Sequence, residues 1–520
     1  MVPPTPAATA GALPERATRQ WSGEAAAVLD PGWRGAVRVL GGPGTGKTSL
    51  LIDTAVARIA AGTAPESVLM LTGSGRLGVR ARGAMTSALL AAPAAQPGRA
   101  VVREPLVRSV HAYAFAVLRL AAQRQGDPPP RLITGAEQEG IIRELLAGDL
   151  EDGAAHWPGA LRVALGTDGF ATELRDLMSR CAERGIDPVQ LRRIGRRAGR
   201  PEWVAAGRFA QQYEQVMLLR SAVGMAAPQA TVPALGAAEL VGAALDAFTA
   251  DPELLAAEHA RVTTLLVDDA QQLDPQAAQL VRVLARGVGA TVLAGDPNQA
   301  VFGFRGADAA VLFDGAGPTI ELATSHRCAP AIARAVTVAA SRLPGRSAAR
   351  AIAGVAGRQG SVSAVLAASE HAEVAVVADT LRRAHLIDGV EWSQMAVIVR
   401  SVPGAGPGLS RALSAAGVPV APPTMEPALP ENPVVAALLT ALAATAGGLT
   451  AEQARELVTG PIGRVDPVTL RQLRRALRRL EPGASDRDFG ELLVAALRDG
   501  VPDGLAAPHQ RPLRRVRAVL

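Results

Sequence analysis

The chain has 520 residues, of which 48% are hydrophobic and 20% charged, and its formal net charge is +6. This composition describes a folded protein long enough for about two to four domains. Its two cysteines, Cys181 and Cys328, lie far apart and outside any CxxC motif, which argues against a disulfide framework or a structural zinc site. The amino terminus has no signal-peptide pattern and no apolar run reaches about 18 residues, so we expect a cytoplasmic protein. The positive charge permits a polyanionic partner, although an arginine-rich and lysine-poor sequence weakens that inference.

Short apolar runs followed by helical patterns occupy much of the first 340 residues. Before them, residues 1–16 are rich in proline and alanine and are predicted to be disordered. The apolar runs are rich in β-branched residues and each leads into a helix, which is typical of strands in a parallel sheet covered on both faces. The sequence therefore predicts an α/β domain. Its strands are expected at 36–41, 67–71, 107–110, 263–269, 290–296 and 319–323.

A different pattern interrupts this domain between its third and fourth strands. The segment opens with QGDPPPRL, contains helical patterns at 137–148 and 203–220, and closes in the alanine- and proline-rich GMAAPQATVPALG. We predict a helical subdomain inserted over residues 121–255. The α/β domain then consists of residues 17–120 and 256–340.

A stretch rich in glycine, arginine and alanine follows residue 340 and indicates a linker. Beyond it the alternation restarts, with strands expected at 362–368 and 395–401 and helices at 371–386 and 408–417. We predict that residues 341–430 begin a second α/β domain and that residues 431–520 are helical. Within the helical part, VTLRQLRRALRRL places leucines on one face and arginines on the other, which favours a solvated face over a phosphate-contacting one.

The stretch GGPGTGKT, residues 41–48, lies between a predicted strand and a predicted helix and fits the GxxxxGK[ST] phosphate loop. Glycines allow backbone N–H groups to surround phosphate oxygens, and the Thr48 hydroxyl is a ligand for Mg²⁺. Lys47 is the only lysine of the chain, and its slim ammonium reaches phosphates where a planar guanidinium is too wide. The predicted nucleotide-binding residues are Gly41, Gly42, Pro43, Gly44, Thr45, Gly46, Lys47, Thr48 and Ser49.

A phosphate loop needs a carboxylate strand, and LLVDDAQQLDP supplies one. Asp268 ends the apolar run and is the predicted metal-side carboxylate, with Thr48 as the second metal ligand. Asp269 is the candidate base for the attacking water. The alternative is that this aspartate pair caps the helix that follows it.

Taken together, these motifs resemble the superfamily 1 DNA helicases of the UvrD/PcrA/Rep type. AGDPNQAVFGFRGAD is a close match to the family's motif III, whereas MLTGSGRLGVRARGAM keeps the usual core of motif Ia poorly. The resemblance implies RecA-like domains, inserted helical subdomains, ATP and Mg²⁺ as cofactors, and single- or double-stranded DNA as partner. It also implies the first RecA-like domain 1A with insertion 1B, and the starts of domains 2A and 2B after residues 341 and 431. The roles that it implies are Gln20 and His326 at the adenine, Arg327 at the γ-phosphate and His111 at single-stranded DNA.

Motif III also has a physical interpretation of its own. Gln299 follows a predicted strand beside the carboxylate strand, where it could sense the γ-phosphate and link hydrolysis to DNA contact. Phe302 and Phe304 follow in a chain with only 3% aromatic residues, and aromatic faces stack on bases of any sequence. The alternative for one or both phenylalanines is a place in the core.

Several departures from the family pattern limit what the resemblance implies. Asp269 replaces the family's glutamate and is one methylene shorter, so hydrolysis is expected to be slower. His326 replaces a tyrosine, so less area is available to stack on adenine. Motifs V and VI do not occur before Leu520, from which we expect that the chain is part of a longer protein rather than one that has lost its second half.

Within the superfamily, the Asp-Asp-Ala-Gln motif and LVTGPIGRVDPVTLRQLRRAL look most like the AdnA-type subunits of AdnAB helicase-nucleases. That resemblance implies an AdnB-like partner subunit, processing of DNA double-strand breaks and a carboxy-terminal nuclease domain that this sequence does not contain. Two alternatives stay open, a stand-alone UvrD-like repair helicase and a weakly hydrolysing, DNA-binding structural subunit.

Overall fold

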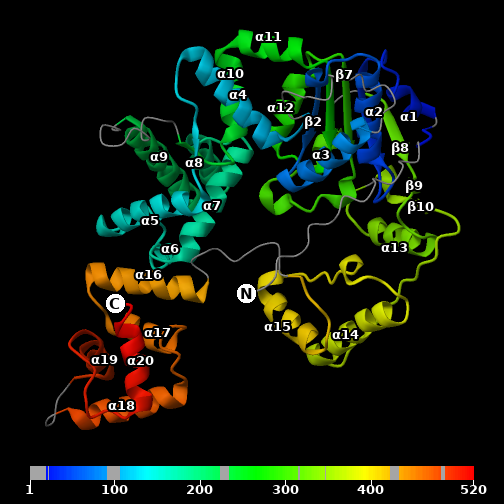
Figure 1. The fold of residues 1–520 in the computed structure, drawn as a ribbon. Helices are drawn as coiled ribbons and strands as arrows, with labels where there is room; N and C mark the ends of the chain where they lie inside the picture. Colours follow the sequence, from blue (N-terminus) through cyan, green and yellow to red (C-terminus); the bar gives the residue numbers. More distant parts are fainter. Residues whose placement is uncertain are drawn as a thin grey trace. The chain divides into compact units, whose positions relative to one another are not determined.

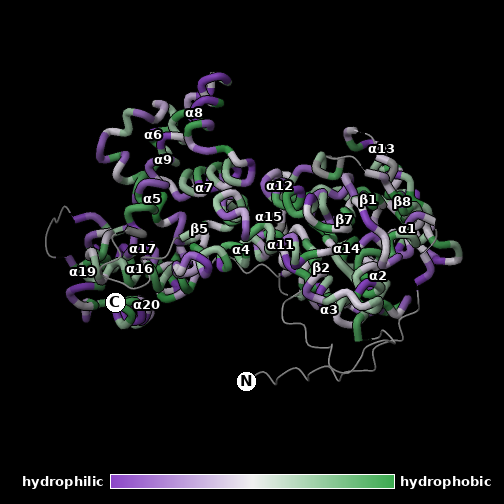
Figure 2. The backbone as a smooth tube through the Cα atoms, turned by 90° about the horizontal axis from the view of Figure 1, so that it is seen from above, coloured by the Kyte–Doolittle hydropathy of each residue, from purple (hydrophilic) through white to green (hydrophobic). Residues whose placement is uncertain are grey.

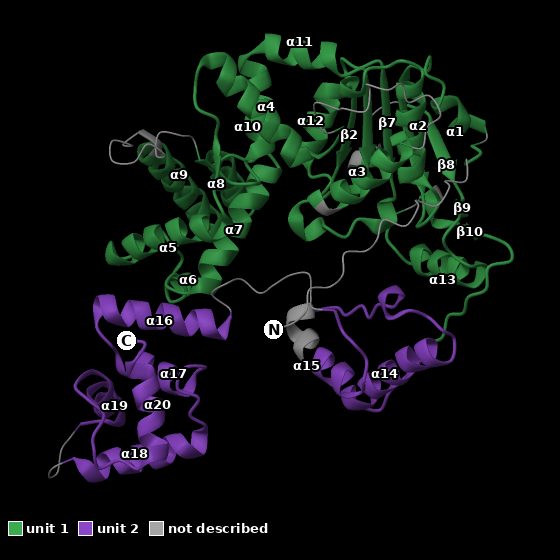
Figure 3. Ribbon diagram, in the orientation of Figure 1, with its two compact units in different colours: residues 1–363 green, residues 364–520 purple. Residues whose placement is uncertain are grey.

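The computed structural model describes residues 19–21, 23–90, 106–222, 234–313, 317–345, 347–421, 432–481 and 487–520. It divides into two compact units, Met1–Ser363 and Ala364–Leu520 (Figure 3). The segment predicted to be disordered, residues 1–16, lies outside the described residues.

A parallel sheet of six strands forms the centre of the first unit, in the order β3-β2-β6-β7-β1-β8 (Figure 1). All six strands predicted before residue 340 are confirmed in this sheet. Their carboxyl ends lie at one edge, where open parallel sheets bind ligands. The strands are β1 (Gly35–Gly41), β2 (Val68–Thr72), β3 (Val107–Ser109), β6 (Thr264–Asp268), β7 (Ala290–Gly295) and β8 (Thr319–Leu322).

Both faces of the sheet are buried, which explains why its strands are apolar runs rather than alternating ones. On β2, Leu69 and Leu71 join the core on one face while Val68 and Met70 join the core on the other. The strand β7 is likewise mostly hydrophobic (Figure 2). Each fully buried side chain of this kind contributes roughly 2 kcal/mol relative to exposure, so the sheet is a stable base for the loops at its edge.

Helices cover each face of the sheet (Figure 1). One layer contains α4 (Val110–Gln125), α10 (Leu240–Ala250), α11 (Pro252–Arg261) and α12 (Pro275–Ala285). The opposite layer contains α1 (Gly23–Val28), α2 (Lys47–Ala60) and α3 (Gly75–Leu90).

A helical region with its own core lies between α4 and α10. It is shorter than the predicted range 121–255, because α10 and α11 pack on the sheet instead. The two helical patterns predicted within it lie in α5 and α9, and a two-residue parallel pair, too short to predict, closes it. Its elements are β4 (Arg131–Leu132), α5 (Gly135–Glu151), α6 (Gly159–Arg162), α7 (Asp168–Glu183), α8 (Pro188–Arg197), α9 (Pro201–Ala222) and β5 (Ala234–Leu235).

The stretch after residue 340 is not a linker. Strand β10 (Ala353–Gly354) pairs in parallel with β9 (Thr324–Ser325), and the buried side chain of Ile352 lies where a Cβ on Gly42 would meet it. This packing carries the first unit to Ser363, beyond the predicted boundary at 340. The helix α13 (Pro330–Ser341) precedes this stretch.

In the second unit the two predicted helices are confirmed as α14 (Glu370–Leu386) and α15 (Val402–Ala415). The strands predicted at 362–368 and 395–401 are wrong, because neither segment pairs with another strand in the described part of the chain. Val365 is 65% exposed and Ile398 94% exposed, so the apolar pattern is present without a neighbouring strand. A strand needs partners that local sequence does not supply.

Five helices over a common core make up the rest of the second unit, as the helical pattern predicts. On α18 the leucines Leu473 and Leu477 are buried and the arginines Arg471, Arg474, Arg475 and Arg478 are exposed. The last helix ends at Arg517, three residues before Leu520. The five are α16 (Pro433–Gly447), α17 (Ala451–Thr459), α18 (Pro467–Leu480), α19 (Phe489–Arg498) and α20 (Ala507–Arg517).

Short 3₁₀ turns complete the structure, several of them at the carboxyl edge of the sheet. None of the helices in the described ranges is long and apolar enough to cross a membrane. The turns are η1 (Pro65–Ser67), η2 (Ala270–Gln272), η3 (Pro297–Gln299), η4 (Gly303–Arg305), η5 (Ala309–Phe313), η6 (Ala348–Arg350) and η7 (Trp392–Gln394).

Candidate active site

The phosphate loop connects β1 to α2 and depends on two glycines. Gly44 and Gly46 have φ values of 76° and 99°, a region that other residues rarely adopt. At Gly44 a side chain is also excluded by space, because a Cβ would lie 2.5 Å from the Cβ of Arg327. The loop therefore brings its backbone close to Arg327 and turns directly into the amino terminus of α2, where free N–H groups favour an anion.

Lys47 is the first residue of α2 and is 9% exposed. Its ammonium donates hydrogen bonds to the carbonyl oxygens of Gly41 at 2.7 Å and Gly42 at 2.9 Å. Burial lowers the pKa of Lys47, while the negative charges of Asp296, Asp269 and Asp268 oppose that shift. Gly41 and Gly42 thus hold the lysine, whereas Pro43 to Ser49 line the cavity themselves.

Two carboxylates lie at the carboxyl end of β6 on the other side of the loop, Asp268 as its last residue and Asp269 directly after it. The Thr48 hydroxyl donates to Asp268 Oδ2 at 2.8 Å, which joins the two predicted metal ligands. Burial, and next the charge of Asp269, raise the pKa of Asp268 to about 6. The alternative role of this pair as a helix cap is excluded, because Asp274 caps α12 by accepting from the Ala277 N–H.

Asp269 has a left-handed backbone, with φ of 51°, which turns its side chain away from the strand direction. Its Oδ1 accepts from the amide of Gln271 at 3.0 Å. The same Gln271 side chain accepts from the Asp296 N–H through Oε1, also at 3.0 Å. Gln271 therefore connects the candidate base, directly after β6, to the residue directly after β7.

Gln299 lies in the turn that follows β7. Its amide donates to Asp296 Oδ2 at 2.7 Å, and its side chain lines the same cavity as Asp269. The backbone carbonyl of Gln299 accepts from Gln272 Nε2 at 2.6 Å, and Gln272 Oε1 accepts from the Phe302 N–H at 3.2 Å. One side chain, that of Gln272, therefore connects Gln299 to the loop that carries Phe302.

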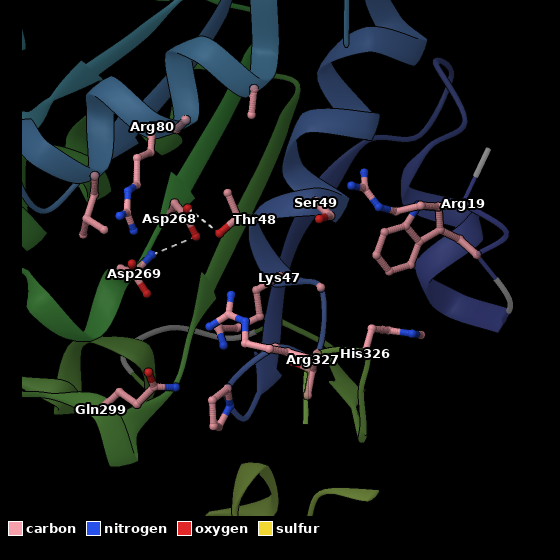
Figure 4. A pocket seen from close by; sticks show the side chains of 18 of the residues that line it. Arg19, Lys47, Thr48, Ser49, Arg80, Asp268, Asp269, Gln299, His326 and Arg327 are labelled. Carbon is pink, nitrogen blue, oxygen red and sulfur yellow. Dashed lines mark hydrogen bonds between the residues drawn. The ribbon is translucent and has the colours of Figure 1, made fainter. Parts of the chain in front are cut away.

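The loop after β8 closes the cavity from a third side. Its backbone is attached to the phosphate loop, because the His326 N–H donates to Gly44 O at 2.9 Å and Ser325 Oγ donates to Pro43 O at 2.7 Å. These bonds place His326 and Arg327 in the cavity wall (Figure 4).

Gln20 lies at the mouth of the cavity with an exposed side chain. Its neighbours are anchored to α2, since Trp21 Nε1 donates to Asp53 at 2.9 Å and Arg19 forms an ion pair with Asp53 at 3.2 Å. The sequence interpretation missed Trp21, whose ring lies against Gly46 and lines the cavity. Its position next to Gln20, in a chain with few aromatic residues, was the available signal.

These residues surround one cavity of about 930 Å³. Figure 4 shows Lys47, Thr48, the two carboxylates and Arg327 turned toward it. Arg80 on α3 and Arg358 after β10, which the sequence interpretation missed, also line it, as does Arg19. Arg80 lies in the segment that keeps motif Ia poorly, and Arg358 lies in the stretch interpreted as a linker, so no motif indicated either of them.

The donor set fits MgATP. The Thr48 hydroxyl and the Asp268 carboxylate are hard oxygen ligands, and Mg²⁺ is usually held by one or two carboxylates together with substrate phosphates. Within the described residues no group of three or more His, Cys, Asp or Glu side chains is placed to hold a metal. When bound, the ion would neutralise phosphate charge beside Thr48 and Asp268.

A second cavity of about 540 Å³ lies between the sheet edge and α7. His111, in the first turn of α4, and Phe302 both line it, so the structure brings these two predicted DNA contacts together. Phe304 does not line this cavity and is 67% exposed. Neither phenylalanine is therefore a core residue, since Phe302 is only half-buried. The Arg305 guanidinium lies 5.9 Å from the ring centroid of Phe302 and 5.5 Å from that of Phe304.

Carboxylates in the second cavity are shifted toward their neutral forms. Burial raises the pKa of Glu183 to about 7 and also raises the pKa of Asp274. Burial lowers the pKa of His111, with Asp274 opposing the shift. The neutral fraction of Glu183 near pH 7 reduces its repulsion of a phosphate.

The sequence of the chain also matches a known protein family. The family described as the UvrD/REP helicase N-terminal domain matches residues 22–315, more than half of the chain. The chain belongs to the UvrD/REP helicase family. As an ATP-dependent DNA helicase of this family, it has its phosphate loop, carboxylate strand and motif III within the matched residues, while His326, Arg327 and Arg358 of the helicase lie beyond them. No curated protein sequence matches the chain.

Proposed function

We propose that the chain is the AdnA-type motor subunit of a heterodimeric helicase-nuclease that processes DNA double-strand ends with an AdnB-like partner. The observation that carries the motor part is the continuous set of hydrogen bonds from Asp269 through Gln271, Asp296 and Gln299 to Gln272 and the Phe302 backbone. The AdnA part is supported by the Asp-Asp-Ala-Gln sequence at residues 268–271.

In this proposal MgATP binds in the larger cavity. Lys47 and the N–H groups of the loop hold the phosphates, with Gln20 and His326 at the adenine. Thr48 and Asp268 hold Mg²⁺. Water attacks the γ-phosphorus, the bond to the β–γ bridging oxygen breaks, and Asp269 accepts the proton from the water. Arg327 stabilises the negative charge that spreads over the γ-phosphoryl oxygens.

Single-stranded DNA follows the second cavity in this proposal. Phe302 and Phe304 offer faces for base stacking, and His111 contacts the strand. Base stacking on an aromatic side chain is worth about 1 to 3 kcal/mol per base and does not depend on sequence, which suits a translocating motor.

Hydrolysis of ATP by the protein, measured with and without single-stranded DNA, tests the motor function. We expect turnover that DNA stimulates, and a fall of at least about a hundredfold in the Lys47→Ala variant, because a buried charge on the phosphates is lost. Lys47→Arg is expected to fail as well, since a guanidinium does not fit the loop. Turnover that is absent from the wild-type protein, or unchanged by both Lys47→Ala and DNA, would refute the motor function.

A second function, a DNA-binding structural subunit that hydrolyses ATP weakly, is favoured by Asp269. Its carboxylate is one methylene shorter than glutamate, and one of its oxygens is already bonded to Gln271. If the chain has this function, the wild-type protein binds both DNA and ATP, but its ATP turnover is as low as that of the Lys47→Ala variant.

The heterodimer is tested separately. The protein is expressed with and without candidate motor partners from the same genome, and degradation of linear duplex DNA is measured. Stable co-purification with ATP-dependent degradation supports the AdnA-type assignment. Unwinding by the chain alone, with no partner retained, indicates a stand-alone UvrD-like helicase instead.

A further inference from the structure

Arg358 lies outside every motif on which the helicase resemblance rests, yet it lines the nucleotide cavity. Its guanidinium Nη1 donates a hydrogen bond to the backbone carbonyl of Arg327 at 2.8 Å. Arg327 is the arginine proposed to contact the γ-phosphate. An interaction with its carbonyl acts on the position of the whole residue rather than on its charge.

The backbone that carries Arg358 is attached to the loop that carries Arg327. The Ala353 N–H donates to Ala323 O at 2.9 Å, and the Val355 N–H donates to Cys328 O at 3.3 Å. These bonds lie on either side of Arg327 in the sequence. The strap formed by residues 352–360 is therefore attached to residues 323–328 on both sides of Arg327.

Close packing strengthens this attachment. A Cβ on Gly354 would lie 2.6 Å from the nitrogen of Pro330, and a Cβ on Gly360 would lie 2.7 Å from the Cβ of Ala329. Neither position accepts a side chain without displacement of the backbone at the start of α13. The absence of side chains at both glycines lets the strap lie directly on the residues that follow the Arg327 loop and begin α13.

The remaining donors of Arg358 are available to the cavity. A guanidinium has five N–H donors, and one is used on the Arg327 carbonyl. In the described part of the chain no carboxylate forms an ion pair with Arg358, although the side chain is exposed. In the described residues no carboxylate therefore competes with the Arg327 carbonyl for this guanidinium.

We propose that Arg358 is a positioning residue for Arg327, which it holds at the γ-phosphate end of the nucleotide. The proposal rests on the proposed binding of MgATP in this cavity. It predicts that Arg358 matters for a nucleotide that has a γ-phosphate and hardly matters for one that lacks it. A residue with only a structural role would affect both nucleotides equally.

The test compares dissociation constants for MgATP and MgADP, measured by fluorescence titration with the full chain. Arg358→Met removes the donors but keeps the aliphatic stem, and Arg358→Lys keeps a donor. Arg342→Ala is the matched control, because Arg342 is exposed at the end of α13 and does not line the cavity. For Arg358→Met we expect MgATP binding to weaken about tenfold, because the charge-assisted hydrogen bond that positions Arg327 is lost, and MgADP binding to change less than about twofold. Arg358→Lys is expected to recover most of this loss.

A double-mutant cycle with Arg327→Ala shows whether Arg358 acts through Arg327. The double variant is expected to bind MgATP as weakly as Arg327→Ala alone. The proposal is overturned if the two losses multiply, if both nucleotides weaken equally, or if Arg358→Met matches Arg342→Ala. Thermal unfolding of each variant shows that it is folded, and Arg358→Ala, which also removes the donors, carries the comparison if Arg358→Met is not. A wild-type protein that binds neither nucleotide would refute the ATP site itself, a different failure.

Discussion

Gln272 is the residue whose substitution tests most directly how the two cavities are connected. Its side chain donates to the Gln299 carbonyl at 2.6 Å and accepts from the Phe302 N–H at 3.2 Å. Gln272→Ala removes both bonds, each with a net value of about 1 kcal/mol. If both contribute to the coupling between nucleotide and DNA, their loss of about 2 kcal/mol corresponds to about thirtyfold in an equilibrium constant.

The assay is ATP turnover with increasing concentrations of oligo(dT), which has no secondary structure of its own. We expect Gln272→Ala to lose stimulation by DNA by about thirtyfold, or to the basal rate if wild-type stimulation is smaller, while turnover without DNA changes by less than about threefold. Gln279→Ala is the control, since Gln279 lies on the neighbouring helix α12 and accepts from Arg282 rather than from either cavity loop. Wild-type stimulation in Gln272→Ala would refute the reasoning, as would an equal loss with and without DNA.

Two further predictions concern Asp269 and Glu183. Asp269→Glu lengthens the candidate base and is expected to raise turnover up to about tenfold. It is also expected to lower Tm slightly, because a backbone φ of 51° suits aspartate better than glutamate. Lower turnover at an unchanged MgATP affinity would show that the shorter carboxylate is the one that fits the site. Glu183 has a pKa raised to about 7, so it is mostly neutral below pH 7 and becomes ionised above it. Affinity for single-stranded DNA is therefore expected to fall as pH rises through about 7, and Glu183→Gln is expected to flatten that fall; an identical pH profile in both proteins would contradict it.

The sheet and the phosphate loop were predictable because their signals are local. A strand such as β6 is an uninterrupted apolar run that ends in two aspartates, and GKT needs no distant residue to be recognised. The run of β6 is uninterrupted because both faces of the strand are buried. The same logic located Asp268, Asp269 and Gln299 at one edge, because parallel strands end at the same edge.

The strap and the second-unit segments were not predictable for the opposite reason. Strand β10 has two residues, and the contacts of Ala353 and Arg358 are with loops about 30 residues earlier in the chain, for which glycine and alanine leave no periodic pattern. At 395–401 the error is reversed, since the local pattern is that of a strand but pairing depends on a partner elsewhere. Trp21 and Arg80 line the nucleotide cavity because the fold places them there, and no sequence motif marks either residue.

Lys47 also has a practical consequence for chemistry on this protein. Because it is the only lysine, every reagent that targets lysine amines has one side chain to react with, besides the terminal amine. That side chain is 9% exposed, and burial lowers its pKa from the usual lysine range. Acylation of this chain is therefore a direct footprint of the phosphate loop, and a bound polyphosphate is expected to protect it.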